Sequence, residues 1–165
     1  MPNQRVLIRV DGGRLYGISL GHVFRCLALA KELKKNHHAQ VTFIMKDYAD
    51  GVAVVKNHGF QVQTIRCDIG NDEEISIIEQ CNGDAVVFDL IDIEEKHTGR
   101  LLGKVKRVVA IDDTGNKKIE ADVIVNGSMV TRFHSYPPSD KPITYYVGSQ
   151  YCVLGEEFEN IPPRE

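Results

Sequence analysis

Short apolar segments alternate with longer amphipathic segments along this chain of 165 residues. The apolar segments are rich in β-branched residues and are typical of buried strands, whereas the longer segments carry apolar residues at helical spacing. Strands are predicted over residues 6–10, 41–45, 61–65, 85–88, 108–111, 123–125 and 143–147, and helices over 22–35, 49–57, 72–80 and 93–105. This alternation predicts an α/β protein built from βαβ units around a mainly parallel sheet.

The predicted helix over residues 22–35 has the clearest pattern, and its apolar side is expected to face the sheet. That side is formed by Val23, Cys26, Leu27, Ala30 and Leu33. The segment 127–142 is rich in Ser, Pro and Asp and is expected to join two strands with little helix. The length is typical of one domain with a sizeable core, although α/β enzymes often combine two such domains.

Composition narrows the function classes. The net charge is −3 and no long run of lysine or arginine is present, which argues against nucleic acid as a partner. Charges interrupt every apolar run, so no membrane span is expected, and the first strand follows the N-terminus too closely for a signal peptide. The cysteines have no paired spacing, and no residues have metal-ligand spacing, so we expect a cytoplasmic protein without a metal or cofactor. They are Cys26, Cys67, Cys81 and Cys152.

The loop between the first strand and the first helix carries the chemistry of greatest interest. It runs from Asp11 through glycines to His22, and Arg25 follows in the first helical turn. The positive end of a helix dipole disfavours a protonated imidazole, and a neutral histidine suits a general base. A cap or packing role for His22 explains a single histidine equally well.

Several predicted strands end in an Asp or Asn. If the sheet is parallel, these side chains converge on the edge where His22 begins its helix, since ligands bind outside the carboxyl ends of parallel strands. Turn formation and helix capping are the alternative explanation. The residues concerned are Asp11, Asp89, Asp112, Asp113 and Asn126.

Three common motifs can be excluded. The loop glycines Gly12, Gly13, Gly17 and Gly21 do not have the G-x-G-x-x-G spacing of a dinucleotide fingerprint. A phosphate loop requires Lys followed by Ser or Thr, where this chain has His22 and Val23. Residues 17–21 match G-x-S-x-G, but the serine comes too long after the strand for a nucleophile elbow.

The motifs taken together resemble those of a known family. They are Asp11-Gly12-Gly13, Gly21-His22-Val23-x-Arg25-Cys26-Leu27-x-Leu29-Ala30, Val87-Phe88-Asp89, Ile111-Asp112-Asp113, Asp122-x-Ile124-Val125-Asn126 and Gly148-x-x-Tyr151-x-x-Leu154 before Glu157-Phe158. The chain resembles the UDP-2,4-diacetamido-2,4,6-trideoxy-β-L-altropyranose hydrolases of the pseudaminic acid pathway and the related spore-coat polysaccharide biosynthesis proteins.

The resemblance implies a Rossmann-like three-layer α/β/α domain, the N-terminal domain of a GT-B architecture. Residues 1–158 would form this domain and 159–165 would begin a linker, while the C-terminal nucleotide-binding domain is absent from this chain. Family members cleave the bond between sugar and UDP by attack of water without a metal. His22 would be the base, oriented by Asp11 or Asp113. The substrate would be bound by Asp11, Gly12, Gly21, Arg25, Asp89, Asp113, Asn126 and Tyr151.

Two departures from the family pattern affect these expectations. The family reads G-x-G-H, whereas three residues separate Gly17 from Gly21 here, and Gly155 stands where the family has an arginine. The resemblance makes an inverting hydrolase of a UDP-activated amino sugar the leading hypothesis. Its partners would be the UDP-sugar and the missing domain. A glycosyltransferase that uses the same base, and a non-catalytic domain that binds a sugar or a protein, are the alternatives. We expect the isolated chain to turn over little or no substrate.

Overall fold

The computed structural model describes residues 4–14, 18–93, 95–158 and 161. Its strands are β1 (Arg5–Val10), β2 (Gln40–Lys46), β3 (Gln61–Ile65), β4 (Ala85–Asp89), β5 (Arg107–Ile111), β6 (Val123–Asn126) and β7 (Thr144–Val147). Its α-helices are α1 (Gly21–His37), α2 (Ala49–Asn57), α3 (Asn71–Gln80) and α4 (Glu95–Gly99). Short 3₁₀ turns cover Thr131–Phe133, Ser149–Tyr151 and Glu156–Phe158.

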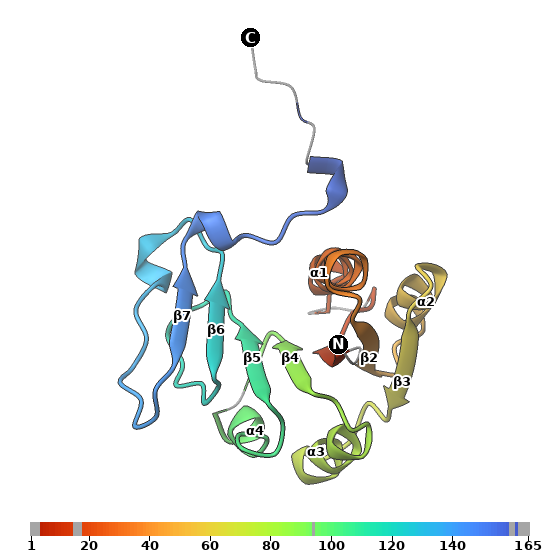
Figure 1. Cartoon of the computed structure of the whole chain (residues 1–165), viewed down its shortest axis with the longest axis horizontal. Coiled ribbons are helices and arrows are strands. Elements are labelled where there is room, and N and C mark those ends of the chain that lie inside the picture. The colour runs from red at the N-terminus through yellow and green to blue at the C-terminus, as the bar shows by residue number, and fades with distance from the viewer. Residues whose placement is uncertain (1–3, 15–17, 94, 159–160, 162–165) are drawn as a thin grey trace.

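The strands form one seven-stranded sheet in the order β3-β2-β1-β4-β5-β6-β7, and every neighbouring pair is parallel (Figure 1). The predicted parallel α/β sheet is therefore confirmed, with strand boundaries that differ by a residue or two. The chain builds outward from β1 to β3, then returns to place β4 beside β1 and builds outward in the other direction. Such a reversal leaves a crevice beyond the carboxyl ends of the two central strands, which is where ligands bind in sheets of this type.

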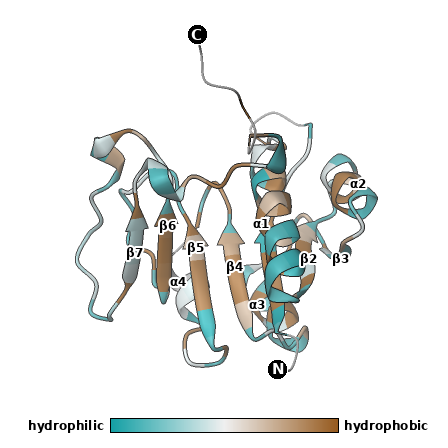
Figure 2. Cartoon of the chain, turned by 45° about the horizontal axis from the view of Figure 1, so that its top comes forward, coloured by the Kyte–Doolittle hydropathy of each residue, from teal (hydrophilic) through white to brown (hydrophobic). Residues whose placement is uncertain are grey.

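Alternate residues along each strand face opposite sides of the sheet. On one side, Ile8 and Phe43 pack with the buried residues of α1 and α2, and we name this side the α1 face. On the other side, Leu7 and Phe88 pack with the buried residues of α3, and we name this side the α3 face. The central strand β4 and its neighbour-but-one β6 are brown along most of their length in Figure 2, as expected of strands buried on both faces, whereas β7 at the edge of the sheet is pale and mostly exposed. The result is a three-layer Rossmann-like α/β/α domain.

Helix α1 follows its predicted pattern closely. Val23, Cys26, Leu27 and Ala30 are all buried against the sheet, and Leu33 is partly buried beside them. The N-cap residue Leu20 makes no side-chain cap bond, and the first N–H, that of Gly21, donates to Ser19 Oγ at the long distance of 3.4 Å. The helix ends in lysine and histidine residues that suit the negative end of its dipole. Burial of the apolar side, rather than capping, therefore fixes the position of the first turn.

The prediction of a helix over residues 93–105 is wrong in its extent. Helix α4 ends at Gly99. In the turns that follow, backbone N–H groups bond to the carbonyl three residues earlier, as Leu101 N–H does to Thr98 C=O. Gly103 adopts a φ of 79°, a left-handed conformation that ends helical geometry and favours glycine. The apolar spacing up to Val105 reflects burial of Leu101 on the α3 face instead of a continuous helix.

After β7 the chain turns back across the carboxyl edge of the sheet toward α1 (Figure 1). We name residues 148–158 the strap. The strap touches the end of β6 closely, because a Cβ placed on Gly127 would lie 2.7 Å from the Cα of Cys152. Of the predicted linker, only Ile161 is among the described residues, so the linker stays a prediction.

Candidate functional site

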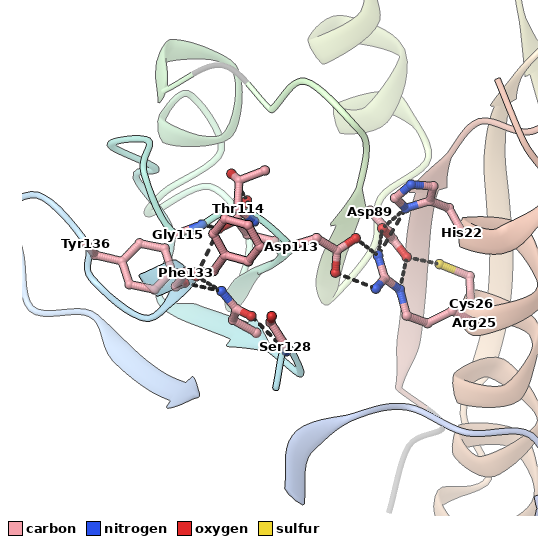
Figure 3. A network of polar contacts seen from close by, with 12 residues as sticks. His22, Arg25, Cys26, Asp89, Asp113, Thr114, Gly115, Ser128, Phe133 and Tyr136 are labelled. Carbon is pink, nitrogen blue, oxygen red and sulfur yellow. Dashed lines mark hydrogen bonds and ion pairs between the residues drawn. The ribbon is translucent and has the colours of Figure 1, made fainter. Parts of the chain in front are cut away.

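Asp89 is the centre of a polar cluster at the carboxyl end of β4. Its Oδ1 lies 2.6 Å from His22 Nδ1 and also accepts a bond of 2.6 Å from Arg25 Nη2. Arg25 Nε donates to Asp89 Oδ2 at 2.9 Å, and Arg25 Nη1 donates to Asp113 at 2.7 Å. Figure 3 shows the Asp89 carboxylate held between His22, Arg25 and Cys26, with Asp113 beyond Arg25. We name His22, Arg25, Asp89 and Asp113 the Asp89 cluster.

The strand pattern explains why these residues meet. Val87 packs on the α1 face and Phe88 on the α3 face, so Asp89 points toward α1 again. His22 and Arg25 are three residues apart and therefore lie on one side of α1. The side chain of Asp89 is fully buried, whereas His22 and Arg25 are about one-fifth exposed. The cluster thus has a buried acceptor and a solvent-facing edge.

The electrostatics of His22 differ from the prediction made from the helix dipole. The hydrogen bond to Asp89 raises the pKa of His22 above its usual 6.5, and partial burial opposes this without cancelling it. Burial would raise the pKa of Asp89, but the hydrogen bonds from His22 and Arg25 lower it instead. A direct contact at 2.6 Å outweighs a dipole effect that is typically below 1 kcal/mol. The carboxylate that orients His22 is Asp89 and not, as predicted, Asp11 or Asp113, neither of which contacts the imidazole.

A hollow of about 360 Å³ opens beside His22 at the crevice between β1 and β4. We name it the His22 hollow. Its wall combines charged, polar and apolar side chains, and its volume suits a single substituted sugar ring. The lining consists of Arg9, Asp11, Ile18, Ser19, His22, Lys46, Tyr48, Asn71, Glu74, Asp89, Leu90, Ile91, Asp92 and His97.

A buried ionic network forms the floor of this hollow on the α3 face. Arg9, only 1% exposed, donates to Glu74 at 2.7 and 3.2 Å and to Asp11 at 2.6 and 2.9 Å. His97 Nε2 lies 2.9 Å from Glu74 Oε1, although the ring is not aligned for a hydrogen bond. Burial would raise the pKa of Glu74, but His97 and Arg9 lower it to about 2. Asp11 is further fixed by the backbone N–H of Lys46 at 2.8 Å.

The carboxylates of the network are therefore satisfied from within the protein. By contrast, the ammonium group of Lys46 has no ion-pair partner among the described residues. Ligand groups that accept hydrogen bonds are the ones that this hollow can satisfy best. Lys46 lines the hollow and can donate to such groups.

A second, smaller hollow of about 190 Å³ lies on the other side of Arg25. Its lining includes Arg25, Asp113 and Tyr151, so three of the predicted substrate-binding residues do come together. They do so beneath the strap, however, and apart from His22. We name this the Tyr151 hollow. The pair of hollows is divided by the Arg25–Asp113 ion pair.

Asn126 is not in either hollow, contrary to the predicted convergence of strand-end residues. It follows Ile124 at an interval of two and so shares the α3 face. There its amide donates to the Phe133 carbonyl at 2.8 Å and to the Tyr136 hydroxyl at 2.9 Å. Asp112 lies on this same face and accepts from Tyr136 at 2.9 Å. Both residues hold the segment after β6 in place.

The predicted glycines have backbone roles. Gly12 packs against α2, because a Cβ placed on Gly51 would lie 2.0 Å from the Gly12 carbonyl oxygen. Gly21 is the first residue of α1 and lies at the outer surface with Arg25. Gly17 lies outside the described residues, so the structure does not test the effect of the longer loop. Gly155 is in the strap, and its neighbour Glu157 lies close to it.

The residues that sequence reasoning missed are Arg9, Lys46, Glu74 and His97. An arginine inside an otherwise apolar strand was the available signal, because a buried charge requires a partner. The partner itself comes from α3, 65 positions away, and no local pattern identifies it.

The described residues contain no group of three or more His, Cys, Asp or Glu side chains arranged to hold a metal ion. None of their helices is long and apolar enough to cross a membrane.

Comparison with known proteins supports the fold. No family model matches the sequence. The uncharacterized protein MJ1062 of Methanocaldococcus jannaschii is 28% identical over 162 residues, which make up 95% of this chain and 32% of that protein. The fold is similar to that in the crystal structure of Acinetobacter baumannii MurG. The TM-score is 0.55 at 20% identity, and the match covers 86% of this chain and 45% of that chain.

The fold is that of a Rossmann-like domain of GT-B type. This chain spans about a third of the archaeal relative and less than half of the MurG chain. The activity of any longer protein that contains it is therefore a matter for proposal.

Proposed function

We propose that this chain is the sugar-binding half of a hydrolase that cleaves a UDP-activated amino sugar and releases UDP. The likeness in fold supports a nucleotide-sugar protein at a coarse level, and the motif resemblance supports hydrolysis. Within the chain, the observation that carries the proposal is the hydrogen bond between His22 and Asp89. It places an oriented histidine at the edge of a hollow of sugar-ring size.

The proposed chemistry uses the geometry of that pair. Nδ1 of His22 lies 2.6 Å from Asp89 Oδ1 and 3.0 Å from Arg25 Nη2. The shorter contact, to the carboxylate, favours the proton on Nδ1, which leaves the Nε2 lone pair free to accept a proton. His22 would remove a proton from water as the water oxygen bonds to the anomeric carbon and the bond to UDP breaks. Asp89 would stabilise the imidazolium that forms. A single displacement of this kind inverts the configuration at the anomeric carbon.

Arg25 has a supporting role in this proposal. Its guanidinium joins buried Asp89 to Asp113, whose side chain is 49% exposed. Two ion pairs on one arginine fix the position of the Asp89 carboxylate, and thereby the imidazole, before substrate binds. The UDP moiety would be held mainly by parts of the protein beyond this chain.

The test is hydrolysis of a panel of UDP-sugars by the full-length gene product, with released UDP as the readout. His22→Ala is the decisive variant, and His58→Ala is a matched control, because His58 is exposed at the end of α2 and bonds only to the Val54 carbonyl among the described contacts. We expect UDP release to fall by about 100-fold or more in His22→Ala and to be unchanged in His58→Ala.

Other outcomes would overturn the proposal in distinct ways. Turnover that survives in His22→Ala would make the histidine structural. UDP release that begins only when a sugar acceptor is added would indicate a glycosyltransferase, with the acceptor hydroxyl in place of water. Binding of UDP-sugars without UDP release under either condition would indicate a non-catalytic binding domain.

A further inference from the structure

We propose that Cys26 is a positioning residue, whose thiol anchors the Asp89 carboxylate and thereby sets how strongly His22 holds its proton. Neither the motif resemblance nor the comparisons assign a role to this side chain. The proposal concerns the free protein and does not depend on the substrate or on the reaction.

The contact geometry supports this role. Cys26 Sγ lies 3.3 Å from Asp89 Oδ2, the same oxygen that accepts from Arg25 Nε at 2.9 Å. The other oxygen, Oδ1, faces His22 Nδ1 at 2.6 Å. Cys26 and Asp89 are both 0% exposed, so bulk water does not compete for the carboxylate. Cys26 follows His22 by four residues on α1, which places both side chains on the side of the helix that faces β4.

The thiol is the donor in this contact. Burial raises the pKa of Cys26 well above its usual value, and the negative charge of Asp89 raises it further. Cys26 therefore remains an S–H group, and an S–H group is a weaker donor than a hydroxyl. A weak donor at this position leaves more negative charge on Asp89, and a more negative Asp89 binds the imidazolium form of His22 more tightly.

Among the other charged groups around His22, Arg25 is the one that shares Asp89 Oδ2 with the Cys26 thiol. Arg25 comes from α1 and Asp113 from the end of β5. The remaining acidic and basic side chains line the His22 hollow. They are Arg9 of β1, Asp11 just after β1, Lys46 of β2, Glu74 of α3, Asp92 after β4 and His97 of α4. A substitution at Cys26 leaves all of these groups in place. Any change in the titration of His22 therefore reports on the Cys26–Asp89 contact.

The experiment is an NMR titration of the His22 ring in the full-length protein, with its signals assigned by their absence in His22→Ala. We expect Cys26→Ala to move the titration midpoint to higher pH, because Asp89 loses a donor. The proton affinity of the imidazole should rise by about threefold. Cys26→Ser keeps a donor of greater strength, so its midpoint should lie below that of the natural protein.

Val23→Ala is the matched control. Val23 is also 0% exposed on α1, and its truncation opens a core cavity without removing a donor from Asp89. Its midpoint should be unchanged. The proposal is wrong if Cys26→Ala leaves the midpoint in place, if Val23→Ala moves it equally, or if Cys26→Ser does not lower it. If the alanine variant does not fold, the serine variant decides the matter, because a lower midpoint supports the proposal and an unchanged or higher midpoint overturns it. Failure of the UDP-sugar assay would leave this result standing.

Discussion

Replacing Arg9 with methionine should destabilise the protein strongly at neutral pH and much less in acid. Methionine fills a similar length of side chain but leaves Glu74, which is 3% exposed, without its guanidinium partner. His97 and Arg9 together lower the pKa of Glu74 from 4.5 to about 2, which corresponds to about 3 kcal/mol of stability at neutral pH. Removing one partner of a buried ion pair costs about 3–5 kcal/mol, which is consistent with that magnitude.

The pH dependence follows from the same pKa. Glu74 has a lowered pKa, so its stabilising contribution is present above about pH 4.5 and is lost as the pH falls toward 2. In the Arg9→Met protein, a protonated Glu74 no longer needs a positive partner. The difference in the free energy of unfolding between the two proteins should therefore shrink as the pH falls from about 4.5 toward 2, the interval between the ordinary pKa of Glu74 and its pKa in the folded natural protein.

Urea denaturation at a series of pH values measures both quantities. The matched control is Arg66→Met, since Arg66 is 67% exposed and pairs with Glu73, the residue next to Glu74. An exposed pair of this kind contributes at most about 1 kcal/mol. The reasoning is refuted if Arg9→Met costs no more than Arg66→Met, or if its cost is the same at pH 7 and pH 3.

Three further predictions concern the loop before α1 and the proposed reaction. Gly51→Ala forces a Cβ to within 2.0 Å of the Gly12 carbonyl oxygen, so thermal denaturation should show a loss of about 1–3 kcal/mol in the free energy of unfolding. The control Gly70→Ala, whose Cβ would meet no atom within 4 Å, should leave the stability nearly unchanged. UDP release should increase as the pH rises through the pKa of His22, which lies above 6.5, because only the neutral imidazole is a base. Asp89→Asn should shift that profile to lower pH and slow UDP release by about 100-fold, and an unchanged profile would contradict the role of Asp89.

Much of the fold was predictable because it depends on local patterns. Runs of Val and Ile between amphipathic segments specify buried parallel strands, and the helical spacing of Val23, Cys26 and Leu27 specifies the buried side of α1. The end of the helix predicted over residues 93–105 was harder to predict. Its apolar spacing continued beyond Gly99 because Leu101 is buried for a different reason, in a turn.

The candidate site was predictable only in part, because its geometry depends on which face each strand end presents. Asp89 and Asp113 face α1 and meet Arg25, whereas Asn126 faces the opposite side by the same alternation. Strand register and exact strand ends decide this, and a boundary error of one residue reverses the answer. The raised pKa of His22 also required knowledge of a contact with a residue 67 positions away.

The division of the crevice by the Arg25–Asp113 ion pair has an evolutionary consequence. The His22 hollow is built from side chains between Arg9 and His97, whereas the Tyr151 hollow takes all its lining except Arg25 from the segment after β4. The chain therefore encodes its two hollows in nearly separate stretches. Substitution or exchange of the stretch from β5 onward can reshape the Tyr151 hollow while the histidine, its carboxylate and the His22 hollow are inherited unchanged.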